Sequence, residues 1–123
     1  MRIDFYLAPK EQVEQGLAEA DSSVHEVCDR WTRADSIQYP QSFLSDLVFA
    51  LYHTVMGEFF EQIKQRHIHF GIPFSRMKEV LGLGAQLCQS AEDVVRDFGR
   101  AVVHAAQEAL SRESALVVDA IAA

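Results

Sequence analysis

The chain has 123 residues, of which 49% are hydrophobic and 24% are charged, with only 3 prolines and 6 glycines. This length predicts one domain, and the composition excludes disordered and fibrous proteins. The formal charge of -7 disfavours nucleic acids and anionic lipids as partners and favours a basic protein.

The acidic excess lies in the first half of the chain. Residues 1–62 carry 11 Asp or Glu against 4 Lys or Arg, whereas residues 63–123 carry 7 of each kind. Residues 62–78 form a short basic segment without an acid, which could meet the acidic half within one chain or across a homo-oligomer.

The N-terminal residues alternate in polarity. Ile3, Phe5 and Leu7 fall on one side of an extended chain, which predicts a short strand or arm over residues 2–7. Residues 67–72 alternate in the same way and are a candidate partner for it.

Residues 9–33 predict an amphipathic first helix. Pro9 suits a helix start, and apolar residues then recur every three or four positions. The opposite face is acidic and forms the predicted partner-binding site: Glu11, Glu14, Glu19, Asp21, Glu26 and Asp29.

A second segment, about 41–66, predicts the central helix of the fold. As a helix it is apolar over roughly 260° of its circumference, so it has to be covered by other helices on two or three sides. Asp46, His53, Glu58 and Glu61 interrupt the apolar run, so this segment does not predict a membrane span.

Three further helices are expected. Ser75 is a predicted N-cap for the third, which Gly82 and Gly84 weaken, and Ser90 with Asp93 predicts the start of the fourth. The apolar phase breaks near residues 111–114, and a C-terminal helix is expected to use Leu116, Val117, Val118 and Ile121.

The predicted fold class is therefore all-α. We expect a single helical domain over residues 1–123, a small four- to five-helix bundle around the central helix, with a short extended N-terminal segment.

Histidines and carboxylates supply weak candidates for chemistry. His67 and His69 could join His53 or His104 as metal ligands, but a place at the C-terminus of the central helix is the favoured interpretation. Glu58 could act as a general acid, and it could share a ligand pocket with His53. His104 and Glu108, four residues apart on a helix, could form an acid-base pair. The preferred interpretation gives the chain no catalytic residue, metal or cofactor, and it is not predicted to be an enzyme.

The face of the fourth helix around His104 is predicted to be a solvated ladder of charges. Its members repeat at helical spacing: Asp93, Arg96, Asp97, Arg100, His104 and Glu108.

The sequence predicts a cytosolic protein, because the N-terminus lacks the pattern of a secretory signal and Cys28 and Cys88 suit small buried thiols. The predicted function is a protein-binding module that docks a basic partner protein and neutralises or chaperones it. Immunity proteins, inhibitors and adaptors share this physical type. The alternatives are a small-molecule- or metal-binding helical bundle and a structural homo-oligomer.

Overall fold

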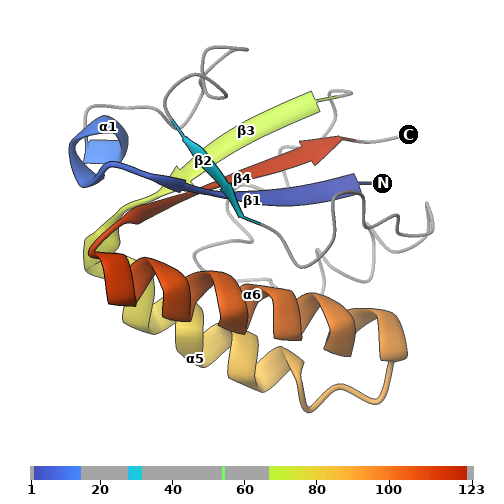
Figure 1. The fold of residues 1–123 in the computed structure, drawn as a ribbon. Helices are drawn as coiled ribbons and strands as arrows, with labels where there is room; N and C mark the ends of the chain where they lie inside the picture. The colour runs from blue at the N-terminus through green and yellow to red at the C-terminus, as the bar shows by residue number, and fades with distance from the viewer. Residues whose placement is uncertain (1, 15–27, 32–53, 55–66, 122–123) are drawn as a thin grey trace.

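The computed structural model describes residues 2–14, 28–31, 54 and 67–121. These residues form a four-stranded antiparallel sheet with two helices packed on one of its faces (Figure 1). In chain order the elements are β1 (Arg2–Ala8), α1 (Lys10–Glu14), β2 (Asp29–Trp31), β3 (His67–Ile72), the 3-10 turn η2 (Phe74–Arg76), α5 (Met77–Leu87), α6 (Asp93–Arg112) and β4 (Ala115–Ile121).

The sheet has the strand order β2-β1-β4-β3. The C-terminal strand β4 lies between β1 and β3, so that Val118 faces Phe5 on one side and Phe70 on the other. Alternate residues of a strand point to opposite faces, and here both faces of the central strands are buried.

The face toward the helices carries the main core. Phe5 packs against Phe98 of α6 with ring centroids 6.1 Å apart. The other strand residues of this core are Ile3, Leu7, Phe70, Ile72, Leu116 and Val118. A smaller cluster on the opposite face joins Tyr6, Ala8, Val13, Ala115 and Val117.

Helices α5 and α6 pack closely because small residues line their contact. A Cβ added at Gly84 would lie 2.9 Å from the Cγ1 atom of Val102, and one added at Gly99 would lie 2.8 Å from the backbone N of Cys88. The buried face of α6 also carries Ala101, Ala105, Ala106 and Ala109, which lets the two helix backbones approach.

The prediction of an all-α helical bundle is wrong. The predicted C-terminal helix is the strand β4, because its apolar run is buried on both sides within a sheet. Glu113 ends α6 in a left-handed conformation, with φ at 51°, and this is the break in phase that the sequence shows near residues 111–114.

The first predicted helix is also wrong as a single element over residues 9–33. The described part of that range contains the five-residue helix α1 and then β2, whose residues pair with β1. The predicted central helix over about 41–66 lies outside the described residues except for Thr54, which lies in a bend.

Two short-range predictions are confirmed. Residues 2–7 and 67–72 are both extended and belong to one sheet, although β4 separates them. The third and fourth helices exist as α5 and α6, but neither predicted serine is the N-cap: α5 begins after Arg76 and α6 after Glu92. No helix in the described part of the chain is long and apolar enough to cross a membrane.

Candidate functional site

Three of the six predicted partner-binding residues lie near the end of β1, where the chain enters α1 and where β2 begins. Strand β1 ends at Ala8 and passes through Pro9 into α1, which exposes Glu11 and Glu14. Asp29, also exposed, begins β2 and stands opposite Leu7, near the end of β1 where α1 departs (Figure 1). We call Glu11, Glu14 and Asp29 the acidic corner.

Apolar contacts hold this corner together. Val13 of α1 is buried against the face of the sheet opposite to α5 and α6. A Cβ atom added at Gly71 of β3 would lie 2.9 Å from the Cγ1 atom of Val13. Cys28 packs against the same small cluster as Val13, just before Asp29. The carboxylates are therefore presented from a helix and a strand that share one anchored cluster.

The acidic corner differs in its charge balance from helices α5 and α6, which we call the helix pair. In the described part of the chain, no ion pair involves Glu11, Glu14 or Asp29. The nearby cation Lys10 instead lies over the Phe74 ring, with its Nζ atom 5.2 Å from the ring centroid. The corner therefore presents negative charge that no neighbouring described residue neutralises through an ion pair.

Most acids of α5 and α6 are paired with an arginine three or four residues away in the chain. Arg76 Nε lies 3.1 Å from Glu79 Oε2, and the remaining pairs are Arg96–Asp93, Arg100–Asp97 and Arg112–Glu108. This confirms the predicted solvated ladder on the fourth helix. Glu92 and Glu113 have no such pair with a described residue, but they lie at opposite ends of α6 and form no cluster.

The structure does not gather the predicted site on one helix face. Asp29 lies on a strand, and Glu19, Asp21 and Glu26 lie outside the described residues. Helical periodicity thus grouped Asp29 with Glu11 and Glu14, although Asp29 belongs to a strand that pairs with β1.

The thiol of Cys28 has a perturbed pKa. Burial, together with the smaller effect of the negative charge on the adjacent Asp29, raises this pKa from 9.0 to about 11. Cys28 and Cys88 are both free thiols. At neutral pH Cys28 is therefore a protonated packing group rather than a thiolate nucleophile.

A buried carboxylate pair was not singled out by the sequence. Asp4 of β1 and Asp119 of β4 face each other directly in the sheet, and each is only 1% exposed. Arg2 reaches Asp4, with 3.4 Å between its Nε atom and the carboxylate Oδ2. His69 of β3 is the register partner of Asp119 on the other side, so charged and polar residue types occupy one row across three strands.

Two of the histidines do not occupy the place predicted for them, whereas His104 does. His67 and His69 lie on β3, not at a helix C-terminus, and His104 lies on the exposed side of α6. His53 and Glu58 lie outside the described residues. Within the described ranges, no three His, Cys, Asp or Glu residues are grouped as a metal site would require.

No protein-family model, curated protein or solved structure matches this chain.

Proposed function

We propose that this protein is a small acidic binding module that docks a basic partner protein through its acidic corner, and that docking neutralises or chaperones that partner. The observation that supports this most is the contrast in charge pairing. Glu11, Glu14 and Asp29 are each exposed without an ion pair to any described residue, whereas most acids of the helix pair are matched by arginines.

Electrostatics explains why such a corner suits a basic partner. Exposed charges that no local cation screens attract an oppositely charged protein over about 8 to 10 Å at physiological salt, which raises the rate of association. The rest of the chain adds to this field through its net charge of -7. Nucleic acids and anionic membranes are repelled by the same field and are not proposed as partners.

The proposal needs no catalysis and no cofactor. It places the protein in the cytosol, where free thiols such as Cys28 and Cys88 stay reduced.

The test is affinity capture from the native lysate with three tagged baits. The first is the wild-type protein, and the second carries Glu11→Gln, Glu14→Gln and Asp29→Asn. The third carries three substitutions that change the net charge equally but lie on the helix pair: Glu79→Gln, Asp97→Asn and Glu108→Gln. Each bait is washed at about 0.05 M and about 0.5 M salt, and the bound proteins are identified by mass spectrometry.

We expect a stoichiometric basic protein that binds the wild-type and helix-pair baits at low salt, and that is lost at high salt or with the corner bait. A partner that the corner and helix-pair baits retain equally would contradict the proposal. An empty wild-type capture, with the protein eluting as a discrete oligomer, would also contradict it and would favour a homo-oligomer instead.

A further inference from the structure

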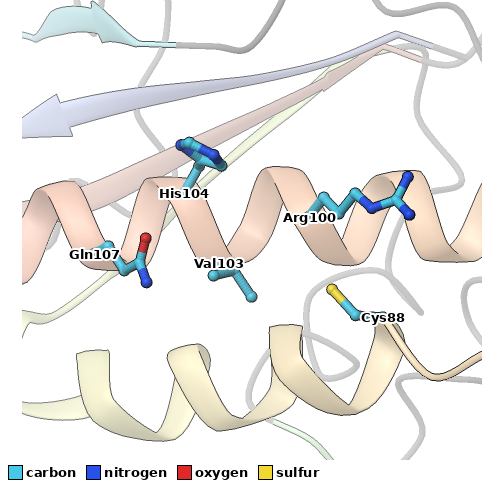
Figure 2. Close-up of a pocket in the computed structure, with 5 residues that line it drawn as sticks. All are labelled: Cys88, Arg100, Val103, His104 and Gln107. Carbon is cyan, nitrogen blue, oxygen red and sulfur yellow. The ribbon is translucent and has the colours of Figure 1, made fainter.

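A groove runs along the exposed side of α6 beside the C-terminal end of α5. Its volume is about 360 Å³, and its lining residues are Cys88, Arg100, Val103, His104 and Gln107. Figure 2 shows the Cys88 thiol directed from the end of α5 toward α6, with Arg100 and Val103 on α6 and with His104 and Gln107 farther along that helix. The groove is remote from the acidic corner in sequence and belongs to the well-packed helix pair.

Hydrogen-bond donors dominate the polar part of this lining. Arg100, His104 and Gln107 stand on one side of α6 because their spacings of four and three residues match the helix repeat. They supply a guanidinium, an imidazole and an amide, and none of the described lining residues carries a carboxylate.

The guanidinium of Arg100 has unused capacity. Its single hydrogen bond among the described residues runs from Nη1 to Asp97 Oδ1 over 3.1 Å. The two side chains are 54% and 56% exposed, so this pair contributes little to stability and can be exchanged for a ligand. The remaining N–H groups of a guanidinium form a fork that fits the two oxygens of a carboxylate or phosphate.

The other lining groups indicate what the anion would be attached to. Val103 and the half-buried Cys88 give the groove an apolar wall next to Arg100. An oxyanion with a small apolar body would place its charge on Arg100 and its body against this wall. The volume is at the lower end of the range for small-molecule sites.

We propose that this groove binds a small organic anion, a carboxylate or a phosphate monoester, with Arg100 as its charge partner. This site goes beyond the proposed partner docking and does not depend on it. The two sources of the oxyanion are distinguished by the probes below.

The test is a titration of the full-length protein followed by ¹H–¹⁵N NMR. The probes are benzoate and phenyl phosphate, and benzamide is the neutral control. We expect saturable shifts of the α6 amides near residues 100–107 with at least one anion and none with benzamide. Saturation by one anion alone identifies which oxyanion the groove takes.

Two variants distinguish specific binding in the groove from nonspecific attraction of anions to an arginine side chain. Arg100→Gln should weaken binding by about tenfold or more, because it removes the charged donor. Arg112→Gln is the matched control, since Arg112 forms a similar exposed pair with Glu108 on α6 but does not line the groove. A second readout is the alkylation rate of Cys88, which a bound anion should slow in the wild-type protein and not in Arg100→Gln.

Either of two results would overturn the proposal. One is the absence of saturable shifts with both anions up to about 20 mM, since affinities weaker than this fall below about 2.3 kcal/mol. The other is an equal loss of binding in Arg100→Gln and Arg112→Gln.

Discussion

Two glycines of α5 give the sharpest test of the packing between the helices. Gly82 is exposed, and a Cβ added there would meet no heavy atom within 4 Å. Gly84 is buried two residues later, where an added Cβ would lie 2.9 Å from Val102 Cγ1, Val103 Cγ2 and the backbone N of Val103. The same change to alanine should therefore have opposite effects at the two positions.

The magnitudes follow from two competing terms. Alanine is favoured over glycine inside a helix by about 1 kcal/mol, and Gly82→Ala should raise the free energy of unfolding by nearly that amount. At Gly84 one of the three close atoms belongs to the α6 backbone and cannot rotate away. The overpacking cost should therefore lie in the upper part of its range, about 2 to 3 kcal/mol, and Gly84→Ala should lower the free energy of unfolding by about 1 to 2 kcal/mol.

The assay is urea unfolding followed by circular dichroism, with the slopes compared so that midpoint shifts report stability alone. The two variants should differ by about 2 to 3 kcal/mol, and thermal midpoints should move by about 3 to 6 °C per kcal/mol for a chain of this size. If Gly84→Ala is as stable as the wild-type protein or more so, the close contact between α5 and α6 is refuted.

Three more outcomes are expected. The alkylation rate of Cys28, measured by mass spectrometry in a variant that lacks the Cys88 thiol, should increase with pH and reach half of its maximum at pH about 11. Asp29→Asn should lower the pH of this midpoint only in part, because burial is the larger cause of the raised pKa. Since the pKa of Cys28 is raised in the folded state, its contribution to stability is present below pH 9 and is lost as pH rises through about 11; a pH-independent denaturation midpoint across that window would contradict this. Glu113→Gly should raise the free energy of unfolding by about 1 kcal/mol in urea denaturation, because glycine adopts the observed left-handed conformation without strain; a destabilised variant would refute this.

Local patterns in the sequence predicted those elements whose signals lie within the element itself. The alternation of residues 2–7 predicted β1, and the spacing of apolar residues after Asp93 predicted α6. The ladder of charges on α6 was also correct, because residues three or four apart on a helix are neighbours regardless of the rest of the fold.

The fold class was wrong because it depends on long-range pairing. Leu116, Val117 and Val118 are three consecutive apolar residues, a run that suits a buried strand as well as a buried helix. The deciding interactions are the ladders that β4 forms with β1 and β3, whose residues lie far away in the chain. No local pattern in β4 reports those ladders.

The candidate sites show the same limit. The acidic face predicted from residues 9–33 assumed one helix, yet Asp29 reaches the corner through its strand pairing with Leu7. The carboxylate pair was missed because Asp119 was assigned to a helix, where it has no relation to Asp4. The sequence signal for this pair is a single aspartate within each of two apolar segments. It indicates a carboxylate pair only when residues 115–121 are recognised as a strand.

The most direct test of the acidic corner as a docking surface is the equilibrium affinity of the captured basic partner, measured by titration calorimetry at physiological salt. The corner variant with Glu11→Gln, Glu14→Gln and Asp29→Asn is compared with the charge-matched helix-pair variant. We predict about a tenfold or larger loss of affinity for the corner variant and a much smaller change for the control. Equal affinities for the two variants would show that net charge, and not the acidic corner, attracts the partner.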